Sequence, residues 1–316
     1  MTREFAPDGL RRDARSVVTT GTFDGVHLGH QAIVRYLVRR AAAIGGVPTV
    51  VTFDPHPRAV LGGHDVPLLT TPEERAALLE ALGVARFVVL PFTRDLSLLE
   101  PETYVEQVLL GAVGLRELVI GYDHRFGRAR RGDRALLEAL GARHGFSVDV
   151  IPEQVARGLT VSSSAIRHLL ADEGDAAGAA ALLGRPYRLA GTVVRGQQRG
   201  RQIGFPTANV QPSDPRSLVP ATGVYAARVF AEGMDAGPEG FPAMLNVGVR
   251  PTFEQAGVRS VEAHLIGFAG DLYGRRVAVD FTARLRDERR FDGPDALAAQ
   301  LREDRAQALR ALAAVA

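Results

Sequence analysis

Gly21-Thr-Phe-Asp-Gly-Val-His-Leu-Gly-His30 is a glycine-rich turn that carries two histidines three residues apart. The β-branched run Ser16–Thr20 before it predicts a strand, and the apolar spacing over residues 31–43 predicts a helix. At such a junction the free N–H groups and the dipole of the helix favour an anion. His27 and His30 add donors at that point. The alternative is a tight turn with histidines that merely face water, but the order FDGxHxGH favours a phosphate site.

Length and composition limit the classes of protein. The chain has 316 residues, enough for two domains with separate cores. No apolar run is long enough to span a bilayer, and residues 1–15 are charged without a signal-type apolar core. We therefore expect a cytoplasmic protein without membrane contact. Cysteine is absent, which excludes disulfides, thiolate nucleophiles and cysteine-based zinc sites.

Lysine is also absent, so all 38 basic residues are arginine. This excludes kinases that depend on a Walker lysine and enzymes that form a Schiff base. The isoelectric point near 9.3 resembles that of a nucleic-acid-binding protein, yet the net charge is only +2. Without lysine or cysteine, few groups titrate above neutrality, so the isoelectric point exaggerates how basic the protein is. We expect no nucleic-acid partner.

Predicted helices and strands alternate up to about residue 150, which is typical of a doubly wound, Rossmann-like α/β domain. Thr71, Pro72 and Glu74 form a capping signature that predicts the start of one of its helices. Two short helices should follow at residues 163–170 and 175–183. The expected strands cover residues 16–20, 47–53, 85–92, 117–121 and 146–151.

The sequence pattern changes after residue 184. From there to residue 281, short predicted strands alternate with turns that contain Gly and Pro. This pattern predicts a compact all-β antiparallel barrel, which we expect to be of a six-stranded type. A final helix over residues 294–313 would pack on the barrel through Leu297, Leu301 and Leu309. We expect two domains, residues 1–184 and 185–316. The barrel strands expected are 189–194, 224–230, 243–247, 261–266 and 276–285.

Three further segments should meet the histidine turn at the carboxyl ends of the first sheet. They are Thr52-Phe-Asp-Pro-His-Pro-Arg58, Gly121-Tyr-Asp-His-Arg-Phe-Gly127 and Val161-Ser-Ser-Ser-Ala-Ile-Arg167. The serines of the third can cap the next helix and offer donors to an anion, with an arginine one turn on. An ordinary serine cap is the alternative if that segment is taken alone.

HxGH together with the Ser-Ser-x-x-Ile-Arg segment resembles the nucleotidyltransferase superfamily. TFDPHP, GYDHRFG and VSSSAIR more narrowly resemble the FMN adenylyltransferase half of bacterial bifunctional riboflavin kinase/FAD synthetases. The resemblance implies that His27 and His30 stabilise charge on the phosphates while the α-phosphorus is attacked. It implies ATP binding by Gly21, Phe23, Gly29, His30, Ser162, Ser163 and Arg167, and contacts to FMN or phosphate by Asp54, His56, Arg58 and Asp123.

The chain departs from that family at two points. Ser164 stands where threonine is common, which keeps the hydroxyl, and His124 follows Asp123 where phenylalanine is common. The second departure leaves the contacts around Asp123 open. The nearby arginines either close over phosphate or face water; they are Arg125, Arg128, Arg130 and Arg131.

In the second domain, residues 191–209 combine a strand, a glycine-rich turn and the polar pair Thr207 and Asn209. Alternate residues of an extended segment point the same way, so the two oxygens can face one magnesium ion. A β-turn that uses the asparagine is the alternative.

GRxxGFPTAN, GVYA, LNVGVRPTF and VExHL resemble the riboflavin kinase domain along nearly its whole length. The resemblance implies that Thr207 and Asn209 hold Mg-ATP and that Glu262 is the base for the ribityl 5'-hydroxyl. Periodicity alone leaves an outward-facing strand glutamate equally open. By the same resemblance the ATP-binding residues are Gly200, Arg201, Gly204, Phe205, Pro206 and Thr207, and the flavin contacts are Asn246, Arg250 and Glu262.

The sequence thus predicts an enzyme that converts riboflavin to FMN and FMN to FAD, with ATP and Mg²⁺. One alternative is the same architecture with one half inactive, most plausibly a riboflavin kinase alone. An arginine-rich RNA-binding protein and a flavin carrier without catalysis are the rivals from other classes. A homo-oligomer remains open.

Overall fold

The computed structural model describes residues 1–5, 10–63, 65–195, 204–235, 237–249 and 259–314. The chain forms two compact units, Met1–Ser162 and Ser163–Ala316.

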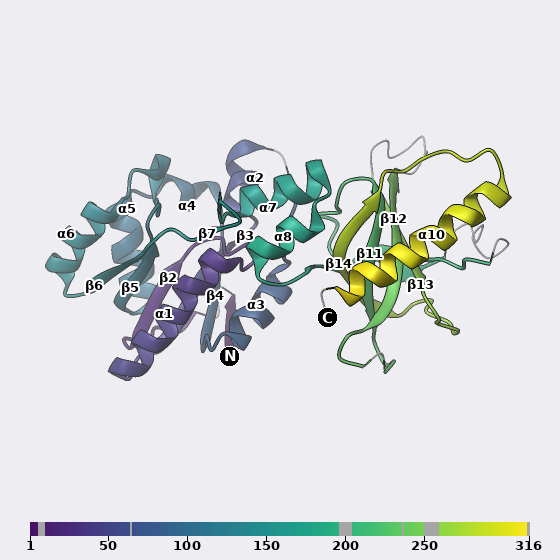
Figure 1. The fold of residues 1–316 in the computed structure, drawn as a ribbon. Helices are drawn as coiled ribbons and strands as arrows, with labels where there is room; N and C mark the ends of the chain where they lie inside the picture. Colours follow the sequence, from purple (N-terminus) through teal and green to yellow (C-terminus); the bar gives the residue numbers. More distant parts are fainter. Residues whose placement is uncertain (6–9, 64, 196–203, 236, 250–258, 315–316) are drawn as a thin grey trace. The chain divides into compact units, whose positions relative to one another are not determined.

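The first unit is built on one six-stranded sheet in which every paired strand is parallel (Figure 1). Its central strands are almost fully buried, because helices cover both faces of the sheet (Figure 1). This confirms the doubly wound α/β class. In spatial order the strands are β1 (Thr2–Phe5), β4 (Arg86–Pro91), β3 (Val47–Asp54), β2 (Ser16–Thr20), β5 (Leu115–Gly121) and β6 (Ser147–Ile151).

Alternate residues of the strands enter two separate cores. Val17 packs in a cluster with α1 (Leu28–Ile44) and α3 (Pro72–Ala81), whereas Val18 packs on the other face. That second face is covered by η1, a π-helix at Tyr104–Val113, and by α6 (Arg134–His144). The remaining short elements are α2 (Pro57–Gly62), α4 (Arg94–Leu98), α5 (Pro101–Thr103), η2 (Arg128–Arg130), β7 (Val155–Ala156) and β8 (Leu159–Thr160).

Helix α3 begins where its capping signature predicts. The backbone N–H of Glu74 donates to Thr71 Oγ1 at 3.2 Å, and the N–H of Thr71 donates to Glu74 Oε2 at 2.8 Å. The expected strands of this unit all form, with ends that differ by up to two residues. Strand β1 was not predicted; it pairs with β4 at the edge of the sheet.

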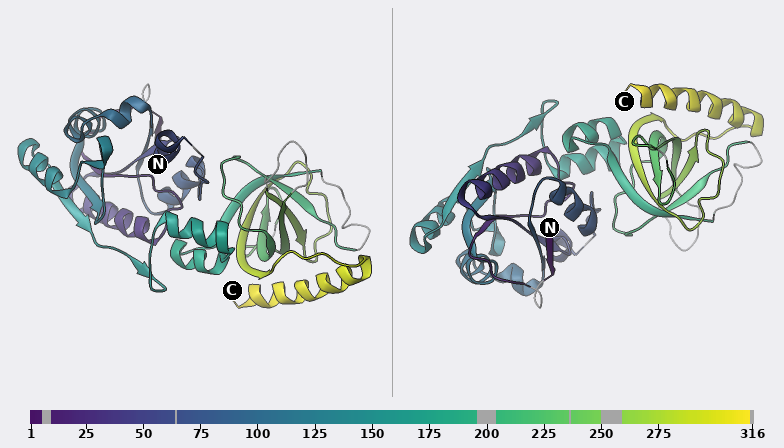
Figure 2. Two further views of the ribbon diagram at one scale, coloured as in Figure 1. Left: turned by 90° about the horizontal axis from the view of Figure 1, so that it is seen from above. Right: turned by 90° about the horizontal axis from the view of Figure 1, so that it is seen from below.

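The second unit is a closed antiparallel barrel of six strands in the order β10-β13-β12-β11-β14-β9 (Figure 2). This confirms the barrel. The sixth strand, β10, was not among the five expected. The bounds are β9 (Tyr187–Val194), β10 (Ala208–Pro212), β11 (Gly223–Ala231), β12 (Phe241–Val249), β13 (Arg259–Leu265) and β14 (Arg276–Arg286).

The helices that follow Ser162 belong to the barrel unit in the structure. They are α7 (Ser163–His168), η3 (Leu169–Glu173) and α8 (Ala176–Leu183), and α8 packs on β9 and β14. The N–H of Ala221 donates to the Leu170 carbonyl at 2.8 Å, and Arg259 donates to the Ala171 carbonyl at 3.0 Å. The division of the structure therefore falls about twenty residues before the expected boundary at 184.

Helix α10 (Pro294–Ala313) lies along the barrel as expected (Figure 1), and Leu301 of the predicted face packs there. Leu309 is 41% exposed, so its assignment to the packing face is wrong. The reason is a polar contact. The carboxylate of Asp304 is fully buried, and its Oδ2 forms an ion pair with Nη2 of Arg286 on β14 at 2.7 Å. The buried residues of the helix are Gln300, Asp304, Ala308 and Leu312, a stripe shifted toward Asp304.

Candidate active sites in the two units

The two histidines of the glycine-rich turn lie one above the other at the start of α1. His27 is the N-cap residue, and its Nδ1 accepts a hydrogen bond from the His30 N–H at 3.3 Å. The two rings stack with centroids 3.6 Å apart, and Phe23 lies 4.9 Å from the His30 ring. A Cβ on Gly29 would lie 3.2 Å from the His27 ring, so glycine makes room for this arrangement.

The backbone of this turn is strained. Phe23 has φ 49° and Val26 has φ 40°, both in the left-handed region, and Gly25 between them has φ 83°. For residues other than glycine such conformations cost about 1–3 kcal/mol each and persist only where the surroundings enforce them. Both side chains are buried in the core under α1. A second set of contacts holds the backbone itself.

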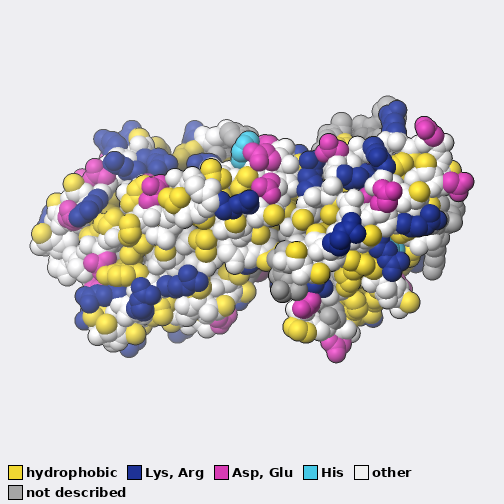
Figure 3. All heavy atoms as spheres, in the orientation of Figure 1, with side chains coloured by type: hydrophobic (Ala, Val, Ile, Leu, Met, Phe, Trp, Pro, Cys, Tyr) yellow, Lys and Arg dark blue, Asp and Glu magenta, His cyan; other side chains and the backbone are white. Residues whose placement is uncertain are grey.

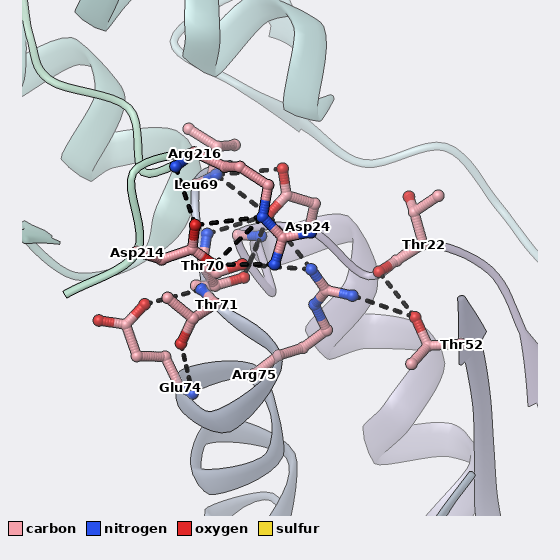
Figure 4. A network of polar contacts seen from close by, with 11 residues as sticks. Thr22, Asp24, Thr52, Leu69, Thr70, Thr71, Glu74, Arg75, Asp214 and Arg216 are labelled. Carbon is pink, nitrogen blue, oxygen red and sulfur yellow. Dashed lines mark hydrogen bonds and ion pairs between the residues drawn. The ribbon is translucent and has the colours of Figure 1, made fainter. Parts of the chain in front are cut away.

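A buried network of hydrogen bonds and an ion pair holds the turn in place through Asp24, which is 0% exposed (Figure 4). Its carboxylate accepts from the N–H groups of Leu69 and Thr70 at 3.1 and 2.9 Å. Arg75 of α3 lies 3.6 Å from the same carboxylate and donates to Thr52 Oγ1 at 3.2 Å. Sequence reasoning assigned no role to Asp24 and missed Arg75.

His30 is held neutral in this environment. Its Nδ1 is buried and has no hydrogen-bond partner among the described residues. Burial lowers the pKa of His30 well below its usual value, and the positive charges of His27 and Arg75 act in the same direction. A polyphosphate bound beside the ring would supply a negative charge and an acceptor, and both favour the protonated form.

The loops expected beside the histidine turn follow strands that neighbour β2. Asp54 ends β3 on one side, and Asp123 follows β5 on the other. His56 caps α2, its Nδ1 accepting the Arg58 N–H at 3.1 Å, so part of its hydrogen-bonding capacity is used by the helix. A Cβ on Gly121 would lie 3.6 Å from Asp123 Oδ1. The topology therefore brings these candidates to one edge of the sheet.

His124, where the family resemblance suggests phenylalanine, behaves as an aromatic residue. Its ring stacks with Phe126 at 5.7 Å. Burial lowers the pKa of His124 to about 4, while the Asp123 charge raises it and Arg130 lowers it further. The ring is therefore uncharged near neutral pH and presents a flat aromatic face.

Three of the four nearby arginines make ion pairs at the surface. Arg125 pairs with Asp133 at 3.1 Å, and Glu100 pairs with Arg128 at 3.2 Å and also with Arg131. These contacts fit the interpretation that the arginines face water.

The serine segment begins close to the histidine turn. The carbonyl oxygen of Val161 would lie 3.6 Å from a Cβ on Gly29, so the chain passes the first turn of α1 just before Ser162. Ser163 and Arg167 lie on α7, which belongs to the second unit. Their contact with ATP stays a prediction.

The second candidate site is a polar row across three strands of the barrel. Glu262 on β13 is directly opposite Asn209 on β10 and opposite Asn246 on β12. Directly opposed residues share a face of the sheet, so the three side chains lie side by side. The neighbouring register rows are buried and apolar, for example Val210, Val261 and Val247. The polar row therefore faces outward from the barrel.

The segment before β10 docks onto this row. Thr207 Oγ1 donates to Glu262 Oε2 at 3.4 Å, and His264 Nδ1 donates to the Pro206 carbonyl at 2.9 Å. The Phe205 and His264 rings are 5.1 Å apart. His264 was not predicted as a site residue, although its spacing of two from Glu262 places it on the same face. Gly200, Arg201 and Arg250 lie outside the described residues, and Gly204 has φ 81°.

Glu288 is a further residue that sequence reasoning missed. Its Oε1 accepts from Asn246 Nδ2 at 3.0 Å, which leaves the Asn246 carbonyl oxygen as the acceptor available on the row. A Cβ on Gly248 would lie 2.7 Å from Glu288 Oε1, so a larger residue there would displace the carboxylate from this position.

The donor set of the row fits Mg²⁺. Within the described ranges there is no cluster of three or more His, Cys, Asp or Glu side chains that could hold a metal. Mg²⁺, however, usually takes one or two protein oxygens together with substrate phosphates and water. Thr207 offers a hydroxyl beside the Glu262 carboxylate, and Asn209 offers an amide oxygen opposite it.

On the face drawn in Figure 3, arginine and acidic side chains are interspersed over both units. In the part of the chain that the structure describes, no helix combines the length and apolarity that crossing a membrane requires.

Comparison with known proteins identifies the family of each half of the chain. The FAD synthetase family model matches residues 10–165, and the riboflavin kinase model matches residues 183–312. A bifunctional riboflavin kinase/FMN adenylyltransferase of Pseudomonas fluorescens is 42% identical over 96% of both chains. Its namesake from Escherichia coli K12 is 36% identical over 91% of this chain and 90% of its own.

A solved structure, named as a macrolide-efflux protein from Streptococcus pneumoniae, is 31% identical and has a TM-score of 0.84. It covers 93% of this chain and 94% of its own length. The curated relatives and the two family models carry the assignment: the chain belongs to the family of bifunctional riboflavin kinase/FMN adenylyltransferases.

Proposed function

We propose that this chain phosphorylates riboflavin to FMN in its second unit and adenylylates FMN to FAD in its first, using ATP for both. The observation that carries the proposal is that each unit contains an assembled polar site where its family model matches. In the first unit this is the stacked pair of His27 and His30 at the start of α1. In the second it is the row around Glu262.

In the kinase step, Glu262 accepts the proton of the ribityl 5'-hydroxyl, and the oxygen attacks the γ-phosphorus while ADP leaves. Thr207 and Asn209 would hold Mg²⁺, which neutralises charge on the ATP phosphates. Asn246, fixed by Glu288, offers an acceptor to a flavin hydroxyl. The other proposed contacts are Gly200, Arg201, Gly204, Phe205 and Pro206 for ATP and Arg250 for the flavin.

In the adenylyl transfer, a phosphate oxygen of FMN attacks the α-phosphorus of ATP, and pyrophosphate leaves. This chemistry needs positioning and charge stabilisation rather than a covalent intermediate. The N–H groups at the start of α1 and the two imidazoles supply both. We further propose that Gly21, Phe23, Gly29, Ser162, Ser163 and Arg167 contact ATP, and that Asp54, His56, Arg58 and Asp123 contact FMN or phosphate.

We also propose a functional boundary at residue 184, a cytoplasmic location and small-molecule partners without nucleic acid; a homo-oligomer stays open. The family models support the boundary, because the kinase model begins at residue 183. The alternative of one inactive half drew on the departure at His124. The neutral ring of His124 against Phe126 weakens it, because the aromatic surface is kept.

The test gives purified protein riboflavin, ATP and Mg²⁺ and separates the flavins by chromatography. Wild type should make FAD, and His30→Ala should stop at FMN. Glu262→Gln should make FMN about 10²- to 10⁴-fold more slowly, yet still convert added FMN to FAD. Wild-type FMN production by Glu262→Gln would refute the base assignment, and no FAD from wild type would refute the first-unit activity. Omitting Mg²⁺ should stop both steps.

A further inference from the structure

A buried cation lies beneath the histidine turn. Arg75 is 3% exposed, although it belongs to the amphipathic helix α3. Its Nη1 donates to Thr52 Oγ1 at 3.2 Å, and its Nη2 donates to the Thr70 carbonyl at 3.2 Å (Figure 4). The same Nη2 lies 3.6 Å from Asp24 Oδ1. A guanidinium is rarely buried to this degree without a specific set of partners.

Each of these partners of Arg75 belongs to the histidine turn or is hydrogen-bonded to it. Thr52 Oγ1 donates to the Thr22 carbonyl at 3.0 Å, and the Gly25 N–H donates to Thr70 Oγ1 at 2.9 Å. Thr70 Oγ1 in turn donates to Asp24 Oδ1 at 3.2 Å. Thr22, Asp24 and Gly25 are therefore each held by a residue that Arg75 contacts, Thr22 through Thr52 and the other two through Thr70.

The conformation that these contacts hold is the one that places the histidines. The left-handed residues Phe23 and Val26 flank the anchored pair of Asp24 and Gly25. Phe23 packs against the His30 ring, and the residue after Val26 is the N-cap His27. Relaxation of either residue to an ordinary conformation would rotate the entry to α1, and with it both imidazoles.

We propose that Arg75 is a positioning residue for adenylyl transfer, which through Asp24, Thr52 and Thr70 holds the turn that sets His27 and His30 against the ATP phosphates. The inference rests on the proposed function of the first unit. Arg75 acts through the turn, so its removal should lower kcat for the FMN-to-FAD step more than it raises KM for FMN.

The chain offers a matched control in Arg86, a second buried arginine of the same unit. Its guanidinium forms an ion pair with Glu4 at 2.7 Å and donates to Ser16 Oγ at 3.2 Å. Arg86 begins β4 and Ser16 begins β2, so this pair lies at the amino ends of the parallel strands, opposite the histidine turn. Arg75→Met and Arg86→Met each remove one buried positive charge. Arg75 lies near the carboxyl ends of the parallel strands and Arg86 near their amino ends.

The experiment measures kcat and KM for FMN and ATP, with riboflavin phosphorylation by the same sample as the internal reference. We expect a fall of about 10²-fold in adenylyl-transfer kcat for Arg75→Met, because small misplacements of catalytic groups have effects of that size. Arg75→Lys should recover part of this loss. The kcat of Arg86→Met should stay within about threefold of wild type in both reactions. The reason is that the histidine turn lies at the carboxyl ends of the strands, near Arg75, whereas Arg86 lies at their amino ends.

Two further variants keep the test decisive if Arg75→Met does not fold. Thr52→Val removes only the hydroxyl that links Arg75 to the Thr22 carbonyl and should lower kcat about tenfold. Asp24→Asn combined with Arg75→Lys should be no worse than the poorer single variant, because the two act as one unit. If wild type makes FAD while folded Arg75→Met or Thr52→Val matches it within about twofold, the positioning role is wrong. If wild type makes no FAD, the proposed function fails instead.

Discussion

His124 should make the stability of the first unit depend on pH, and His124→Phe should remove that dependence. The half-buried ring stacks on Phe126, and its desolvation lowers its pKa to about 4 from the usual 6.5, with Asp123 raising it and Arg130 lowering it. Phenylalanine keeps the aromatic contact and carries no proton.

The sign follows from where each state binds the proton. The unfolded chain protonates His124 below about pH 6.5, whereas the folded chain does so only below about pH 4. The folded state is therefore fully stable above pH 6.5 and loses stability as the pH falls toward 4. Each pH unit in this window is worth about 1.4 kcal/mol, so His124 should contribute a loss of about 2 kcal/mol between pH 7 and pH 5.

The assay compares urea unfolding at pH 7 and pH 5 for wild type and His124→Phe, followed through amide signals of β2 and β3. His30 has a lowered pKa as well and shifts stability in the same direction, but it is present in both proteins. The difference between the two proteins therefore isolates His124. An NMR titration of the His124 ring provides an independent check. Equal losses of stability in both proteins, or a titration midpoint near 6.5, would refute the reasoning.

Two further predictions concern single contacts, one in each unit. Gly29→Ala places a Cβ 3.2 Å from the His27 ring and should displace it by a few tenths of an ångström, lowering FMN-to-FAD kcat about tenfold or more; an unchanged FAD rate would contradict this. Asp304→Asn weakens the buried pair with Arg286 and should destabilise the barrel by about 3 kcal/mol, measured by urea unfolding of the barrel signals; a change under about 1 kcal/mol would show that the pair is dispensable.

The sequence predicted most of the sheet because its central strands are continuous apolar runs, as burial on both faces requires. It missed β1 and β10 for a different reason. Thr2–Phe5 is short and polar, and Ala208–Pro212 ends in proline, so both are strands only through their partners. On α10 the prediction was right for Leu301 and wrong for Leu309, because hydropathy places Leu309 inward whereas the pair with Arg286 brings Asp304 there instead.

The candidate site residues, like the strands, could be predicted from the sequence only in part. The histidine turn is contiguous in sequence, so its glycines and histidines identify it directly. Arg75 is absent from any such motif, and its spacing in α3 resembles that of a solvated helix position. The kinase row gathers residues 209, 246 and 262 through strand register, which spacing along the chain does not encode. Glu262 could be selected only by family resemblance. Glu288 could be found neither from the sequence pattern nor from that resemblance.

The absence of lysine explains how these sites handle phosphate. Several arginines in the described residues are paired with carboxylates: Arg75 lies against Asp24 and Arg86 against Glu4 in buried pairs, and Arg286 lies against the buried Asp304. With 36 acidic residues against 38 arginines, little permanent positive charge remains for a polyanion. At the histidine turn we therefore expect phosphate binding to depend on oriented N–H groups and on His30, whose pKa burial lowers and which a bound anion would help to protonate. We expect such a site to select a compact phosphate that enters the turn over an extended nucleic-acid backbone, whose affinity comes from many fixed charges.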